Sequence, residues 1–185
     1  MHQSLKFIFR LILALIIFTV TLALLLTCYS KFNTLAQANT WLEHRQQSEL
    51  VSSNQQSYLL LSNSQKPDRA IFIVLKGKGY ISKISCEHYQ TTLCLSSYDK
   101  SPYREVRKAI LQIIGPYQYI QSINYVDTQT NMPGNLTLTQ QQVINFYQQD
   151  MSALKYYLLG VFLFTIIALI SSIRILKNFR SFLTK

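Results

Sequence analysis

Two long apolar stretches, one near each end of the chain, constrain its fold more than any other feature. They run from Leu5 to Cys28 and from Lys155 to Arg174, and neither contains an acidic residue. Each holds about 18 or more nearly uninterrupted apolar residues, the length that a helix needs to cross the hydrocarbon layer of a membrane. The sequence therefore predicts transmembrane helices at residues 7–28 and 155–174, joined by one extramembrane domain at residues 29–154.

The distribution of charge predicts an orientation for these helices. The chain carries a net charge of +10, and all eight of its acidic residues lie between the two apolar stretches. Short flanks rich in lysine and arginine stay in the cytoplasm. We therefore expect residues 1–10 and 175–185 to be cytoplasmic tails and the central domain to be exported. The basic residues of the two ends, which carry no acidic neighbour, are Lys6, Arg10, Arg174, Lys177, Arg180 and Lys185.

The composition bears on the compartment and on two classes of partner. Many glutamine, asparagine, serine and tyrosine residues with few glycines are typical of an AT-rich bacterial genome, which predicts a bacterial inner-membrane protein with a periplasmic domain. In a eukaryotic setting, Asn135-Leu136-Thr137 would instead be a glycosylation acceptor. An exported domain without a ladder of basic and aromatic residues disfavours nucleic-acid binding. The expected partners are the lipid bilayer and a protein.

The first apolar stretch has two other readings. It would be a cleaved signal peptide if Ala36-Gln37-Ala38 were the processing site, but its apolar run is longer than that of a signal peptide. It would be a lipoprotein signal if Cys28 were lipidated, but Thr27 stands where such signals carry a smaller residue. An uncleaved anchor is the favoured interpretation.

The exported part predicts a small α+β domain. A capping box from Thr34 to Gln37 opens a helix to about Leu50, unless the first span simply continues outward. Hairpin-linked strands follow at residues 58–61, 70–75, 80–86 and 92–97, with turns at 66–68 and 76–79.

The second half of the domain predicts one inserted helix. Ser101 as N-cap, Pro102 at the first helical position and Gly115 after the last turn indicate a helix at residues 102–114. A strand at 117–126 and a loop at 127–135 follow. A second capping box, Thr139 to Gln142, opens a helix that runs on into the second span. The predicted fold is an antiparallel meander of about five strands with this one helix inserted.

Cys86 and Cys94 enclose seven residues and predict a structural disulfide across a hairpin tip. Their spacing is not that of a redox pair or of a zinc site, so His88 between them is expected to be an exposed loop residue. The turn Lys76-Gly77-Lys78-Gly79 lacks the pattern of a phosphate-binding loop and predicts a hairpin turn. No cofactor and no metal is expected.

Tyr117, Tyr119 and Tyr125 alternate along one predicted strand and are the candidates for partner binding, because tyrosine is enriched at interfaces. The alternative is that they pack one sheet face against the helix at 102–114. Ala168 and Ser172 form a pair of small residues at the spacing that lets membrane helices approach. The expected membrane-interface anchors are Arg10, Lys155, Tyr156, Tyr157, Arg174 and Lys177.

The absence of a nucleophile, metal or nucleotide motif in the sequence predicts that the chain is not an enzyme. The leading hypothesis is an accessory or structural subunit of an envelope complex whose exported domain binds a protein partner. Two alternatives stay open: an immunity-type inhibitor of a toxin that acts in the periplasm, and a membrane enzyme whose site is assembled only in space.

Overall fold

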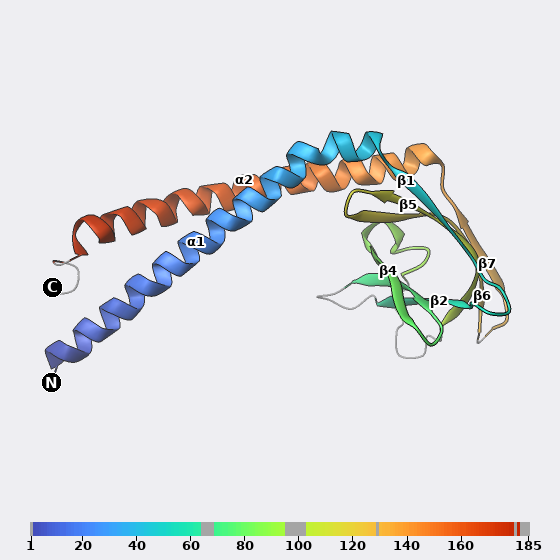
Figure 1. Ribbon diagram of the computed structural model, residues 1–185, viewed down its shortest axis with the longest axis horizontal. Coiled ribbons are helices and arrows are strands. Elements are labelled where there is room, and N and C mark those ends of the chain that lie inside the picture. Colours follow the sequence, from blue (N-terminus) through green and yellow to red (C-terminus); the bar gives the residue numbers. More distant parts are fainter. Residues whose placement is uncertain (1, 64–68, 95–102, 129, 180, 182–185) are drawn as a thin grey trace. The chain divides into compact units, whose positions relative to one another are not determined.

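The computed structural model describes residues 2–63, 69–94, 103–128, 130–179 and 181. The chain divides into two compact units (Figure 1). The helix-pair unit contains residues 1–38 and 150–185, and the sheet unit contains residues 39–149. The sheet unit thus stands in the middle of the sequence, between the two halves of the helix pair.

Two long helices carry the apolar stretches: α1 (His2–Glu43) and α2 (Gln140–Lys177). By length and composition both are apolar enough to cross a membrane. The helices are longer than the predicted spans. Thr34 lies inside α1, where its hydroxyl donates to the Ser30 carbonyl oxygen at 3.1 Å. The prediction of a separate helix from Thr34 was therefore wrong, and the alternative, an outward continuation of the first span, is what the structure has.

The N-terminus of α2 confirms the second capping box. The Gln142 amide N–H donates to the Thr139 hydroxyl at 3.2 Å, and the Thr139 N–H donates to the Gln142 side-chain oxygen at 2.8 Å. Two N–H groups that a helix N-terminus leaves unpaired are thereby satisfied. The helix then continues without a break into the second apolar stretch.

The sheet unit is built on one antiparallel sheet in the order β4-β3-β2-β5-β6-β7, in which β1 also pairs with β5. β1 pairs with residues 108–113 of β5 and β2 with residues 104–106, so the two short strands share one edge of the long one. The strands are β1 (Gln46–Val51), β2 (Tyr58–Asn63), β3 (Ala70–Leu75), β4 (Gly79–Ser85), β5 (Arg104–Ile114), β6 (Tyr117–Asp127) and β7 (Pro133–Thr137).

The predicted helix at residues 102–114 was wrong, because from Arg104 onward this segment is strand β5. Its apolar residues follow helical spacing, but most are β-branched, and β1, β2 and β6 pair with it along both edges. A bulge at Arg107, between Val106 and Lys108, shifts the alternation of buried residues and so imitates a helical period. The predicted cap residues Ser101 and Pro102 lie outside the described residues.

Four further expectations about the sheet need correction. Residues 46–51 form β1 rather than the end of a helix, and residues 133–137 form β7 rather than a loop. Of the strand predicted at 92–97, residues 92–94 instead belong to a turn after the short 3-10 helix η1 (Glu87–Tyr89). Residues 95–97 and the predicted turn at 66–68 lie outside the described residues. The described part of the domain has seven strands instead of about five, and no α-helix is inserted between its described strands.

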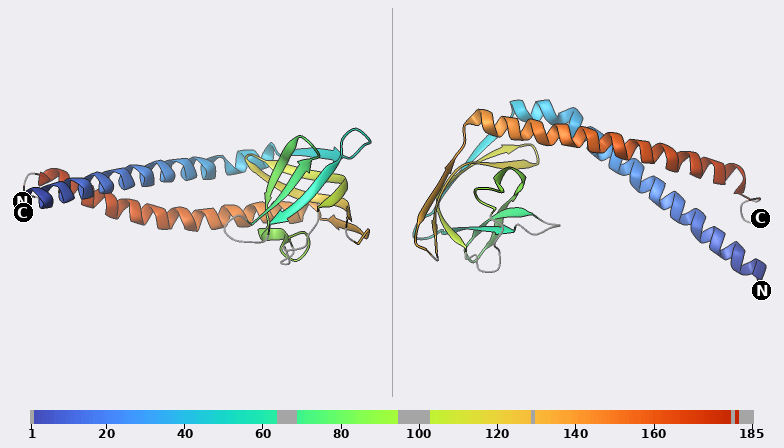
Figure 2. Two further views of the ribbon diagram at one scale, coloured as in Figure 1. Left: turned by 90° about the horizontal axis from the view of Figure 1, so that it is seen from below. Right: turned by 180° about the vertical axis from the view of Figure 1, so that it is seen from behind.

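The sheet is strongly curved (Figure 2). The core of the sheet unit lies on one of its faces. Tyr89 of η1 is fully buried there, and its hydroxyl accepts from the Ile120 N–H at 2.8 Å and donates to the Ile120 carbonyl at 3.1 Å. A register shift of β6 against β5, which skips Gln121, lies next to Ile120. The tyrosine thus satisfies backbone groups where the ladder is irregular. The largest fully buried aliphatic side chains are Leu60, Ile71, Ile73, Ile84, Leu93, Ile114, Ile120 and Ile123.

The turn between β5 and β6 depends on a glycine. Gly115 has a φ of +57°, and a Cβ atom there would lie 2.4 Å from the Trp41 ring. The left-handed conformation and the close approach of the indole both exclude a larger residue. The glycine that was predicted as a helix stop is therefore a hairpin turn residue.

Candidate functional site

The structure confirms the disulfide between Cys86 and Cys94, whose Cα atoms are 5.7 Å apart. The two cysteines lie on either side of η1 rather than on two facing strands, and both are buried in the sheet core. His88 in η1 is half-buried instead of exposed, and its ring stacks on Phe146 of α2 at 4.3 Å. The described residues include no group of three or more His, Cys, Asp or Glu side chains that could hold a metal ion.

The three candidate tyrosines of β6 do not form one exposed surface. Tyr119 is buried and packs edge-on against Tyr147 of α2, which Tyr117 also contacts. Burial, together with the neighbouring Tyr117, raises the pKa of Tyr147 to about 12. Tyr125 lies half-buried under the Arg104 guanidinium, 5.1 Å from it. The alternative interpretation, that the tyrosines pack the sheet against a helix, thus holds for Tyr117 and Tyr119. The helix is the first part of α2 and not residues 102–114.

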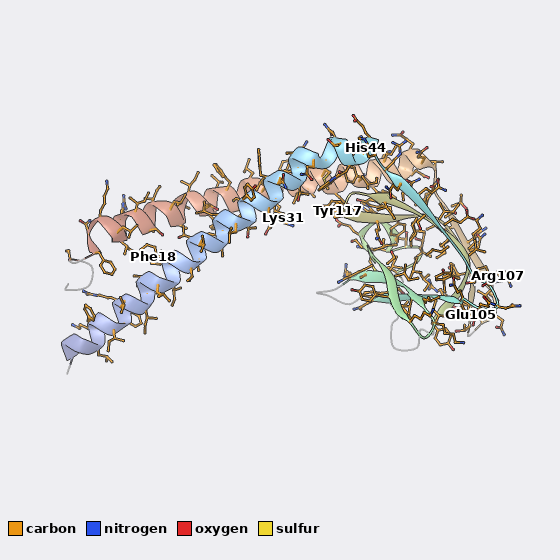
Figure 3. The ribbon with its side chains drawn as sticks, in the orientation of Figure 1. Phe18, Lys31, His44, Glu105, Arg107 and Tyr117 are labelled. Atoms are coloured by element: carbon orange, nitrogen blue, oxygen red, sulfur yellow. A yellow bond between two sulfur atoms is a disulfide. The ribbon has the colours of Figure 1, made fainter. Side chains whose placement is uncertain are left out.

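The β5–β6 hairpin separates these aromatic contacts from a charged end. Tyr117 lies near the turn of the hairpin, and Glu105 and Arg107 lie at its other end (Figure 3). Within the hairpin, the aromatic contacts with α2 lie at the turn end, where Tyr117 and Tyr119 pack against Tyr147.

A different surface carries exposed aromatic and basic side chains, and sequence reasoning missed it. On strands β2, β3 and β4, the residues that point away from the core are aligned in two rows across the sheet. Leu61, Phe72 and Lys83 form one row, and Leu59, Val74 and Tyr80 form the other. We call these six residues the outer face. None of them is buried, and Tyr80 is 72% exposed.

Side-chain contacts order part of the outer face. The rings of Phe72 and Tyr80 meet edge to face with their centroids 6.4 Å apart, and the Lys83 ammonium lies 5.8 Å from the Phe72 centroid. An ammonium over an aromatic ring is attracted to the ring's negative face. The lysine is thus held beside the two rings while its side chain stays exposed.

The turn between β3 and β4 adds two lysines to this basic surface. Lys76 and Lys78 are exposed, and the glycines that alternate with them have positive φ angles of 82° and 97°. The expected hairpin turn at residues 76–79 is confirmed. Together with Lys83, the turn places three positive charges around exposed aromatic and aliphatic side chains, and β3 and β4 themselves contain no acidic residue.

The helix-pair unit contains a second organised surface, a seam between α1 and α2. The Thr21 and Ser172 hydroxyls are 2.9 Å apart, and the Cys28 sulfur is 3.3 Å from the Thr165 hydroxyl. A row of buried or half-buried positions recurs every seven residues along both helices, as in an antiparallel coiled coil. The predicted small pair lies in this seam, since the Ala168 carbonyl also accepts from Thr21. The seam positions are Ala14, Thr21, Cys28 and Leu35 of α1 and Leu158, Thr165 and Ser172 of α2.

Outside the seam, the helices expose large apolar side chains from Leu5 to Phe32 of α1 and from Tyr156 to Leu176 of α2. Ile167 is 62% exposed and Phe164 is 67% exposed. Of the predicted anchors, Lys155, Tyr156 and Tyr157 lie exposed at one end of the second apolar stretch and Arg174 and Lys177 at the other, and Arg10 is half-buried on α1. The basic and aromatic residues therefore bracket the apolar surface.

Comparison of the chain with protein-family models, with curated proteins and with solved structures finds no match. The function is accordingly argued from the two surfaces just described, the outer face of the sheet unit and the apolar surface of the helix pair.

Proposed function

We propose that this chain is a two-span inner-membrane protein whose exported sheet unit binds a protein partner, as an accessory or structural subunit of an envelope complex. The observation that carries the proposal is the exposure of large apolar side chains on the helix pair outside the seam. Such a surface is unfavourable in water and is favourable against lipid. This exposure supports the anchoring of the sheet unit at a membrane.

Two features support the orientation. The short flanks beyond the apolar stretches carry basic residues without acidic ones, which favours the cytoplasm for both ends of the chain. The sheet unit contains the Cys86–Cys94 disulfide, and disulfides persist in oxidising compartments outside the cytoplasm. Two unrelated properties thus support opposite sides of the membrane for the termini and the sheet unit.

The outer face supports the binding role. An exposed cluster of aromatic and aliphatic side chains bordered by lysines is typical of a protein-binding surface, where aromatic residues form the centre and charges the rim. The lysines Lys76, Lys78 and Lys83 favour a partner segment that is acidic around an apolar centre. In this proposal Tyr117, Tyr119 and Tyr125 hold the domain together and the outer face meets the partner.

The test is purification of the full chain from its own membranes in mild detergent after brief cross-linking, with the attached proteins identified and their stoichiometry measured. We expect one stoichiometric membrane or periplasmic partner. Reversing the charges (Lys76→Glu, Lys78→Glu and Lys83→Glu together) should release it, whereas a matched reversal on α2 at Lys177→Glu should not.

Four results would contradict the proposal. A solitary protein, or a partner retained by the triple variant, would refute binding through the outer face. Capture of a secreted toxin in place of a membrane subunit would favour the immunity alternative. Catalytic turnover by the purified chain alone would favour the enzyme alternative.

A further inference from the structure

A groove on one side of the helix pair borders the seam, and all of its lining residues belong to the helix-pair unit. It has a volume of about 540 Å³, within the range of pockets that hold small-molecule ligands. α1 contributes Cys28, Tyr29 and Phe32 to its walls, and α2 contributes Lys155, Leu159 and Phe162. With the exception of the lysine, these side chains are apolar or aromatic, so the groove has one charged point in an otherwise apolar lining.

We infer that this groove binds one lipid molecule with an anionic headgroup, its acyl chain along the apolar walls and its phosphate at Lys155. The inference rests on the proposed function, because it requires both helices to cross a membrane. Lys155 begins the second apolar stretch, beside the exposed Tyr156 and Tyr157, where a lysine and tyrosines would lie at headgroup level. The groove then continues from this level into the apolar part of the pair.

The shape of the walls favours an acyl chain over a third helix. Membrane helices associate through small residues that let their backbones approach closely. This groove is instead walled by bulky residues, and Tyr29, Phe32 and Phe162 are all more than half exposed. A flexible hydrocarbon chain follows such walls, whereas a rigid helix would touch them only at their tips.

Charge supports an anionic headgroup. The described residues give Lys155 no ion pair, and the second apolar stretch contains no acidic residue to neutralise it. A lysine close to an anionic lipid surface contributes a favourable interaction that corresponds to about fivefold in binding. Phosphatidylglycerol is a suitable probe because it is anionic and carries two acyl chains.

The thiol of Cys28 can report whether a lipid occupies the groove. Cys28 is a free cysteine, half-buried in the wall of the groove, while the other two cysteines are bonded to each other. The full chain is reconstituted in vesicles of phosphatidylcholine alone or with about one third phosphatidylglycerol, and the rate of Cys28 alkylation by a membrane-permeant maleimide is measured. Native mass spectrometry of the same samples counts the retained lipids.

We expect phosphatidylglycerol to slow alkylation and one molecule of it to be retained. Lys155→Gln should weaken this protection by about fivefold. Lys31→Gln, which removes a lysine of α1 that does not line the groove, should leave it unchanged. Leu159→Trp, which fills the groove, should abolish lipid retention in both kinds of vesicle.

Equal alkylation rates in the two kinds of vesicle would overturn the inference, as would retention of the lipid by Leu159→Trp. If pure phosphatidylcholine also protects Cys28 from alkylation, and Lys155→Gln does not change that protection, the site does not require an anionic headgroup. Resistance to alkaline extraction is measured in parallel. A chain that is extracted refutes membrane insertion itself, whereas an inserted chain without lipid protection refutes only the lipid site.

Discussion

The helix pair and the sheet unit bury opposite kinds of residue. In the helix pair most of the buried positions hold small residues such as Ala14, Thr21 and Ser172, and most of the large apolar side chains point outward. In the sheet unit the large side chains, such as Ile73 and Tyr89, are buried. A soluble domain gains stability by removing large apolar surface from water, whereas helices in lipid gain it from close packing and polar contacts. The contrast supports the proposal that the helix pair lies in lipid and the sheet unit in water.

The largest effect should come from a charge on the outward side of the helix pair. Ile167→Asp places a carboxylate near the middle of the second apolar stretch, at a residue that is 62% exposed. The expected cost of membrane insertion is about 3 kcal/mol, measured as the loss of resistance to alkaline extraction. Tyr80→Asp, at the more exposed outer face, should leave resistance to extraction unchanged. If the Ile167→Asp variant resists alkaline extraction as well as the Tyr80→Asp variant does, the two units do not differ in this way.

The next effect concerns the disulfide of the sheet unit. Reduction of Cys86–Cys94 should lower the free energy of unfolding by about 2–3 kcal/mol, because the open chain gains freedom in the unfolded state. Thermal unfolding with and without a reductant measures the change. The double variant Cys86→Ser and Cys94→Ser should unfold at the lower temperature in both conditions. A reduced protein with the unfolding temperature of the oxidised one would contradict the structural role.

Tyr89→Phe should destabilise the sheet unit by about 1–3 kcal/mol, because it leaves the buried N–H and carbonyl of Ile120 without their hydroxyl partner. Urea unfolding of the full chain in detergent, followed by aromatic fluorescence, measures it. Tyr80→Phe removes a hydroxyl from an exposed ring and is the matched control. If Tyr89→Phe and Tyr80→Phe unfold at the same urea concentration, the hydroxyl of Tyr89 does not stabilise the sheet unit.

A smaller effect tests the seam. Thr21→Val removes the hydroxyl that lies 2.9 Å from that of Ser172 and should weaken the helix pair by about 0.6 kcal/mol. Thr19→Val is the control, since Thr19 bonds the Leu15 carbonyl of its own helix and is exposed. Helical circular dichroism in mixed micelles of increasing denaturing-detergent content measures both. Equal losses would show that the seam hydroxyl has no special role.

The smallest effect comes from the ionisation of the Tyr147 hydroxyl and appears only at alkaline pH. Because the pKa of Tyr147 is raised from 10.0 to about 12, its neutral form is favoured in the folded state. Its contribution to stability is present below pH 10 and is lost as the pH rises towards 12. The unfolding free energy of the wild type should fall more steeply over this range than that of Tyr147→Phe. Parallel curves would contradict burial of this hydroxyl.

Local signals in the sequence predicted the parts of the fold that local interactions determine. The apolar stretches gave the two long helices, and Thr139 with Gln142 gave the start of α2. The run at residues 70–75 is strand β3 with the predicted bounds, and Cys86 is bonded to Cys94. Each of these features depends on residues close together in the chain.

The failures lie where distant pairing decides the structure. Residues 104–114 have a helical pattern, but three strands from other parts of the chain pair with them. β7 was taken for a loop because Pro133 and Gly134 favour turns, whereas in the structure Gly134 accommodates the Tyr125 ring. The outer face depends on the register of β2, β3 and β4, which no local pattern specifies. The seven-residue spacing of Ala14, Thr21 and Cys28 was a readable signal for the seam.

The central claim is that the helix pair crosses a membrane with the sheet unit outside the cytoplasm, and cysteine labelling in intact cells tests it most directly. In a Cys28→Ala background, Lys78→Cys places a thiol on the β3–β4 turn and Lys177→Cys places one at the end of α2. The account predicts that a membrane-impermeant maleimide labels Lys78→Cys in intact cells and Lys177→Cys only after permeabilisation. The reverse pattern, or labelling of both positions in intact cells, would contradict it.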